Sequence, residues 1–172
     1  VVAFSLATSA MAVPEQFASV AHANSTSTSM NSLRNFRDAS DSNSVLKPGV
    51  LYRSAEFKGL TAGDRKKLAN TLQGGTIIDL RTTGQRKAVP DKSISGVKNS
   101  TIPITGILDQ KPMVTDAKRR AQVGKALKKA ANSDGPVLIH CVNGKDRTGW
   151  TVAMIMYVSG ASDQEVMQEY MQ

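Results

Sequence analysis

The chain has 172 residues, enough for one domain with a hydrophobic core of its own. Its formal net charge of +8 favours anionic partners such as phosphorylated molecules and acidic lipids. A single cysteine excludes an intrachain disulfide. Neither an RNA-binding aromatic motif nor a zinc-finger spacing is present, so we expect no nucleic acid partner.

The first 32 residues differ in composition from the rest. Residues 1–13 are apolar and uncharged, too short a run for a transmembrane helix but typical of a secretory signal. Ala-x-Ala-like sites follow at residues 10–12 and 21–23, and residues 24–32 are rich in Ser, Thr and Asn. We expect residues 1–32 to be a partial signal peptide, lacking its first residues, and a linker. The protein would then be secreted or in the cell envelope; a loose N-terminal arm on a cytoplasmic protein is the alternative.

The globular region is expected to run from Leu33 to Gln172. Residues 50–53 follow a Pro-Gly turn and are typical of a short strand. Thr61 can cap a helix that ends at two glycines, residues 74–75, and Asp64 imitates a capping box there. The continuous apolar run at 76–80 predicts a buried strand, and residues 101–105, which contain Pro103, predict a strand near an edge.

The second half of the chain continues the alternation of strands and helices. Residues 116–131 predict a helix, residues 133–136 a turn, and residues 137–139 a strand. A helix-length run follows at 150–158, and Ser162 with Glu165 forms a capping box that opens a last helix. This order predicts an α/β fold with a central, mainly parallel sheet flanked by helices.

The main functional motif is His-Cys-Val-Asn-Gly-Lys-Asp-Arg-Thr-Gly at residues 140–149. It places Cys141 at the start and Arg147 at the end of a loop between a strand and a helix. The loop amides and the helix dipole should bind a dianionic phosphate, and the guanidinium can grip two of its oxygens. The structural alternative, a cysteine buried as a small apolar residue, explains neither the arginine nor the Thr-Gly pair.

Each position of the loop has an expected role. The positive field favours the thiolate of Cys141, which attacks phosphorus and forms a phosphocysteine that water later cleaves. Gly144 keeps the loop tight, Thr148 can hydrogen-bond the sulfur, and His140 orients the loop through its ring nitrogens. The other residues expected to contact the phosphate are Val142, Asn143 and Lys145.

A general acid must protonate the leaving alcohol. Asp146 lies inside the motif and is favoured, whereas Asp109, in a loop that could close over the site, is the alternative. Lys145 adds a cation that would suit a substrate with more than one phosphate.

Three charged residues at strand ends are further candidates for the pocket: Arg53, Asp79 and Arg81. They could line the pocket or buttress the loop, and a structural ion pair is the alternative. The basic residues between 118 and 129 most simply form a solvated helix face, with contact to an acidic membrane surface as the second hypothesis.

The motif resembles the phosphate loop of cysteine-dependent phosphatases. Its Gly-Lys-Asp-Arg-Thr-Gly form looks like that of atypical bacterial tyrosine and phosphoinositide phosphatases, of the mycobacterial protein tyrosine phosphatase B type. Supporting motifs are Asn-Phe-Arg-Asp at 35–38, Leu-Tyr-Arg-Ser at 51–54 and Asp-Leu-Arg at 79–81. The resemblance implies that fold from Leu33 to Gln172 and supports Asp146 as the acid.

The chain departs from that family at two places. Residues 39–41 read Ala-Ser-Asp where the family usually has two glycines, and Gln85 stands where it usually has Glu. The second change removes a charge that could pair with an arginine. Family members also continue beyond the last predicted helix, so a C-terminal helical part is expected to be missing.

The sequence therefore predicts a cysteine-dependent phosphatase that needs neither metal nor cofactor. Its substrates would be phosphomonoesters: phosphotyrosine, phosphoserine or phosphothreonine in proteins, or phosphoinositides. The alternatives are a phosphate-binding pseudophosphatase without turnover and, less favoured, a rhodanese-like sulfurtransferase.

Overall fold

The fold comes from a computed structural model that describes residues 29–105 and 111–172. The signal-peptide prediction and Asp109 lie outside these residues. Within them, the predicted linker ends earlier than Ser32, because Met30 is buried and the backbone amide of Ser32 donates to Asp64 at 2.8 Å. No helix in the described part is both long and apolar enough to cross a membrane.

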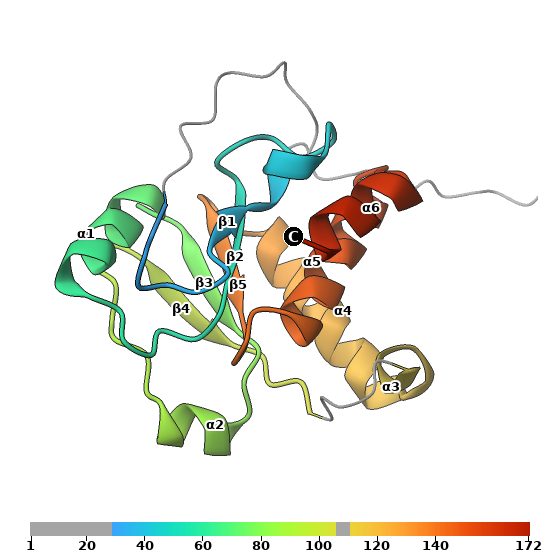
Figure 1. Cartoon of the computed structure of the whole chain (residues 1–172). Coiled ribbons are helices and arrows are strands. Elements are labelled where there is room, and N and C mark those ends of the chain that lie inside the picture. Colours follow the sequence, from blue (N-terminus) through green and yellow to red (C-terminus); the bar gives the residue numbers. More distant parts are fainter. Residues whose placement is uncertain (1–28, 106–110) are drawn as a thin grey trace, which may run out of the picture.

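A five-stranded sheet with the order β1-β2-β5-β3-β4 forms the centre of the molecule (Figure 1). β2, β5, β3 and β4 run parallel, and only β1 at the edge is antiparallel, which confirms the prediction of a mainly parallel sheet. The bounds are β1 Arg37–Asp38, β2 Leu51–Ser54, β3 Thr76–Asp79, β4 Lys98–Thr101 and β5 Val137–His140.

Helices cover both faces of this sheet (Figure 1). α1 (Ala62–Thr71) lies on one face, and α4 (Ala117–Ala131), α5 (Asp146–Val158) and α6 (Asp163–Tyr170) lie on the other. Because side chains alternate along a strand, Ile77 and Leu138 pack into the core beside α1. Ile78 and Ile139 pack into the core on the other side. The sheet is thus buried on both faces, as its continuous apolar strands require.

The predicted starts of the helices after Thr61 and Ser162 are confirmed by their caps. The Thr61 hydroxyl accepts from the Asp64 amide, and Ser162 and Glu165 form a complete capping box. The side chain of Asp64 does not complete a box, since it accepts from the amide and hydroxyl of Ser32 instead. These bonds, with Lys67 nearby, hold the pKa of Asp64 below its usual value.

The structure differs from the sequence predictions at several short elements. The edge strand ends at Thr101 instead of beginning there, because Pro103 beyond it has no N–H for a ladder. α5 begins at Asp146, four residues before the predicted run. Elements too short to show periodicity were not predicted: β1, the 3-10 helix η2 (Ala39–Ser42), α2 (Thr83–Ala88) and α3 (Lys111–Thr115).

Candidate active site

The predicted phosphate loop lies between the end of β5 at His140 and the start of α5 at Asp146. This is the carboxyl end of the parallel strands, where α/β sheets bind their ligands. Strand, loop and helix therefore occur in the predicted order.

The carbonyl groups of loop residues 142–145 all accept hydrogen bonds from the surrounding protein. Each carbonyl from residue 142 to residue 145 accepts a hydrogen bond, whereas no described residue accepts one from the amides of these residues. The donors are the Glu56 amide to Val142 (3.1 Å), Asn35 Nδ2 to Asn143 (2.6 Å), Arg53 Nη2 to Gly144 (2.6 Å), and Arg53 Nη2 (3.3 Å) and the Gly149 amide (2.8 Å) to Lys145. With the carbonyls bound outward, the amides are free to bind an anion.

Gly144 is required by the path of this loop. Its φ is +69°, and a Cβ atom there would contact the Ser54 carbonyl oxygen and approach the Ala55 nitrogen to 2.6 Å. Any side chain would therefore meet both backbone strain and a clash with the end of β2. The prediction that glycine keeps the loop tight is consistent with this geometry.

Cys141 is a free cysteine, 3% exposed, at the first position of the loop. It packs with the core on the α5 side of the sheet. The Thr148 hydroxyl is buried without a hydrogen-bond partner in the described part of the chain, so the expected bond to the sulfur is not formed. Its role in binding stays a prediction.

Arg147 is 1% exposed, and among the described residues its anchors all bind one nitrogen, Nη1. Its Nη1 donates to the Leu80 carbonyl (3.1 Å), the Ile104 carbonyl (3.3 Å) and Gln85 Oε1 (3.0 Å). Its Nε is buried and has no hydrogen-bond partner among the described residues. Gln85 thus occupies the expected position of an arginine partner, although its amide brings no charge.

Arg53 buttresses the loop and also lines a cavity beside Gly144 and Lys145. Its Nη2 binds the Gly144 and Lys145 carbonyls, and its Nη1 pairs with Glu169 at 2.6 Å. Glu169 on α6 is 1% exposed and also accepts from Arg37 Nε at 3.1 Å. Burial and the nearby Arg53 charge lower the pKa of Arg37, although Glu169 opposes this shift. The last helix therefore supports the loop through one carboxylate.

Arg81 and Asp79 belong to a buried ion-pair network, the arrangement expected if these residues are structural and do not line the pocket. Arg81 Nε and Nη2 each lie 3.0 Å from an oxygen of Asp79. Arg81 also pairs with Glu56 at 3.1 Å and Asp91 at 2.6 Å. These charges, and Asp79 above all, raise the pKa of Arg81 against the opposing effect of burial.

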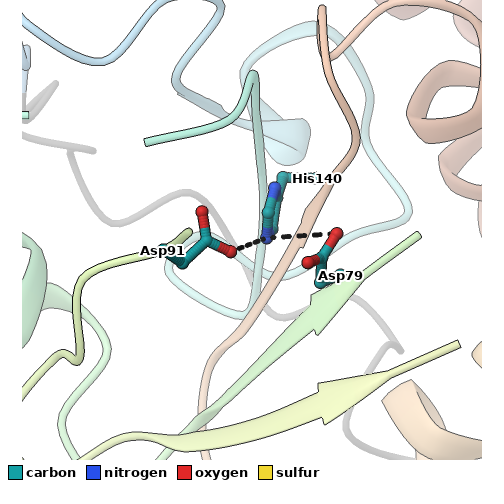
Figure 2. Close-up of side chains that lie close together, drawn as sticks. All are labelled: Asp79, Asp91 and His140. Atoms are coloured by element: carbon teal, nitrogen blue, oxygen red, sulfur yellow. Dashed lines mark ion pairs between the residues drawn. The ribbon is translucent and has the colours of Figure 1, made fainter. Parts of the chain in front are cut away.

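His140 faces this network from the end of β5 (Figure 2). Its Nε2 lies 3.2 Å from Asp91 Oδ2 and 3.8 Å from Asp79 Oδ1. Ligand atoms of these three residues lie within 4.8 Å of one another, a spacing that a metal ion could bridge. The guanidinium of Arg81 already contacts both carboxylates, so the cluster has its cation and does not fit a metal site.

Asp146, the favoured general acid, lies at the start of α5. It is half-buried, and no hydrogen bond or ion pair to another described residue restrains its carboxyl group. Lys145 beside it is exposed. Asp109, the alternative acid, lies outside the described residues.

Three acidic residues that hold the site together were not predicted from the sequence: Glu56, Asp91 and Glu169. Glu169 follows the buried Val166 by three residues, so helical periodicity would have placed it on the buried face of α6. Glu56 comes two residues after β2, at a strand end. Asp91 lies in an irregular segment after α2, and no local pattern points to it.

Comparisons with known proteins agree with this geometry. One relative is the triple specificity protein phosphatase PtpB of Mycobacterium tuberculosis, 24% identical over 80% of this chain and 65% of that protein. Another is a tyrosine-protein phosphatase of Nostoc commune, 28% identical over 70% of this chain and 47% of its own length. The chain thus spans between about half and two thirds of these relatives.

Two solved structures share the fold. The core catalytic domain of the PP-IP phosphatase SIW14 from S. cerevisiae matches with a TM-score of 0.55 and 21% identity, covering 83% of this chain and 77% of that one. TpbA of P. aeruginosa in complex with pTyr matches with a TM-score of 0.53 and 22% identity, covering 88% and 81%. Residues 28–172 match the tyrosine phosphatase family as a whole. With its Cys-x5-Arg loop framed between β5 and α5, the chain belongs to the tyrosine phosphatase family.

Proposed function

We propose that this protein is a cysteine-dependent phosphatase that hydrolyses phosphomonoesters. The observation that carries the proposal is that the three buried arginines of the described residues differ in the charge of their partners. Arg53 and Arg81 are paired with carboxylates, whereas Arg147 has only neutral acceptors among the described residues. A buried cation without an anionic partner is costly, and a bound phosphate would supply that partner.

The proposed reaction has two steps. The Cys141 thiolate attacks phosphorus, the bond to the leaving oxygen breaks, and Asp146 gives that oxygen its proton. Water then attacks the phosphocysteine with Asp146 as base, which releases phosphate and restores the thiolate. Throughout, the loop amides and Arg147 would bind the three other phosphate oxygens and stabilise the charge that develops on them.

A direct test measures phosphate release from p-nitrophenyl phosphate, phosphotyrosine and phosphoserine peptides and a phosphoinositide panel. Cys141→Ser should abolish release, and Arg147→Lys should reduce it at least tenfold because lysine lacks the planar fork. A wild-type protein that binds phosphate without releasing it from any substrate would be a pseudophosphatase. Release of thiocyanate in a parallel thiosulfate assay would instead indicate a sulfurtransferase.

The acid is tested by the pH dependence of the rate. Asp146→Asn should remove the limb of the profile that requires a protonated acid, and Asp109→Asn should keep it. The opposite result would assign the acid to Asp109.

Substrate class and location are part of the proposal. PtpB is named a triple specificity phosphatase and SIW14 a PP-IP phosphatase, which supports including phosphoinositides beside phosphoproteins.

α4 exposes Lys118, Arg120, Lys125 and Lys128, which supports contact of an exported enzyme with acidic membranes. Co-sedimentation with phosphatidylserine vesicles at low and high salt tests the contact. Fractionation of cells that express the gene tests export.

A further inference from the structure

The ring of His140 lies directly behind the proposed nucleophile and is fixed in place. It is fully buried, and its plane stacks on Phe57 with a centroid distance of 4.9 Å and an interplanar angle of 22°. Its Nδ1 lies 3.4 Å from the Cys141 carbonyl oxygen. A carbonyl oxygen can only accept, so the hydrogen of this contact is on Nδ1.

The opposite nitrogen, Nε2, faces acidic groups (Figure 2). Asp91 Oδ2 is 3.2 Å away and Asp79 Oδ1 is 3.8 Å away, at ion-pair distance but without a well-aligned hydrogen bond. Although burial acts to raise the pKa of Asp91, its contacts with His140, Arg81 and the Phe57 amide together lower it. An ionised carboxylate has no proton to offer, so a favourable contact requires the proton on Nε2.

The charges around the His140 ring also favour protons on both ring nitrogens. Three carboxylates, those of Glu56, Asp79 and Asp91, converge on the single guanidinium of Arg81. They come from the segments after β2 and α2 and from the end of β3, and His140 is the only other titratable group in contact with them among the described residues. A doubly protonated imidazole provides this network with a second cation.

We propose that Asp91 is a positioning residue that holds His140 with protons on both ring nitrogens, so that its Nδ1–H and its positive charge face Cys141. This role deepens the proposed function and rests on it, because the charge on His140 favours the nucleophilic thiolate. Asp91 acts only through His140 and touches no reacting atom.

Alkylation of Cys141 by iodoacetamide across a pH series tests the role without turnover, since Cys141 is the only cysteine. In Asp91→Asn, the pH of half-maximal alkylation should rise by about one unit. At low pH the alkylation rate should therefore be roughly tenfold lower than in the wild type, and at high pH the two rates should be equal. Glu56→Gln is the matched control, since it removes a carboxylate from the same arginine and should cause no such rise. A lower midpoint in Asp91→Asn would mean that Asp91 acts only as a negative charge and would overturn the proposal.

A second variant tests whether the effect passes through His140. In a His140→Asn protein, whose shorter amide can still donate to the Cys141 carbonyl, adding Asp91→Asn should leave the alkylation profile unchanged. An equal shift in both backgrounds would refute the positioning role. If the wild type releases no phosphate from any substrate, the proposed function fails, but the alkylation profiles still decide the role of Asp91.

Nitrogen NMR of the wild-type ring provides a measurement that needs no variant in the network. The chain has two histidines, and His22→Gln leaves only the signals of His140. Under the proposal, both ring nitrogens of His140 carry hydrogen at about pH 7. A neutral tautomer there would overturn the proposal even if Asp91→Asn failed to fold.

Discussion

Glu169 on α6 stabilises the fold and the phosphate loop together, so replacing it with Gln should affect both. The carboxylate is 1% exposed and lies 2.6 Å from Arg53 Nη1 and 3.1 Å from Arg37 Nε. Glu169→Gln keeps the shape of the side chain but leaves the buried Arg53 charge without its counter-ion. Removing one partner of a buried pair costs about 3–5 kcal/mol. Because Gln retains an oxygen acceptor, we expect the lower end, a loss of about 3 kcal/mol.

Urea and thermal unfolding, followed by the fluorescence of the single tryptophan, Trp150, measure this loss. In a domain of about 150 residues each 1 kcal/mol lowers the Tm by about 2–4 °C, so the Tm should fall by about 6–12 °C. Asp163→Asn is the control: it removes the same charge from an exposed position of the same helix and should cost less than about 1 kcal/mol.

Phosphate release, measured at a temperature where every variant is folded, should also slow in Glu169→Gln. Arg53 holds the Gly144 and Lys145 carbonyls, and a less restrained Arg53 would hold them less firmly. If Glu169→Gln lost no more stability than Asp163→Asn, the pair would not support the fold in the way its burial indicates.

Three further predictions concern the loop, the acid stability and the arginine partner. Gly144→Ala should lower phosphate release at least tenfold and destabilise more than Gly96→Ala, because both positions have positive φ but only Gly144 lies against backbone. Positive φ alone costs about 1–2 kcal/mol, and equal unfolding losses would contradict the clash. Hydrogen bonds from the amides of Ser162 and Ser44, and from their hydroxyls, lower the pKa of Glu165 to about 2. Since a depressed carboxyl pKa stabilises only above the unfolded value, stability should fall from about pH 4.5 to about pH 2, and Glu165→Gln should flatten that part of the Tm profile. A Gln85→Glu variant retains the α2 cap, adds a charge-assisted bond to Arg147, and should raise unfolding free energy by about 1 kcal/mol. Because that charge competes with the ligand, it should also weaken inhibition by inorganic phosphate about tenfold, and unchanged inhibition would argue against a phosphate partner for Arg147.

The parts of the site that are contiguous in sequence could be predicted from it. Strand, loop and helix around Cys141 and Arg147 follow from a local pattern of apolar runs and a fixed spacing. The supports of the loop could not be predicted, because they come from distant segments: Glu169 is 116 residues from Arg53, and Asn35 is 108 residues from Asn143. A single sequence carries no signal for such pairs. The charged strand ends Arg53, Asp79 and Arg81 were recognised, but their assignment to a buttress or an ion-pair network needed the tertiary contacts.

The distribution of charge explains why Gln85 is compatible with a phosphate site. Three large arginines are fully buried, and each needs compensation for the loss of water. The Glu169 carboxylate on α6 neutralises Arg53, and those of Glu56, Asp79 and Asp91 neutralise Arg81, so both arginines serve the scaffold. Arg147 is oriented by two carbonyls and the Gln85 amide, which fix its position without cancelling its charge. A neutral partner at residue 85 therefore leaves that charge to be compensated by the ligand, and the affinity for phosphate should depend on it.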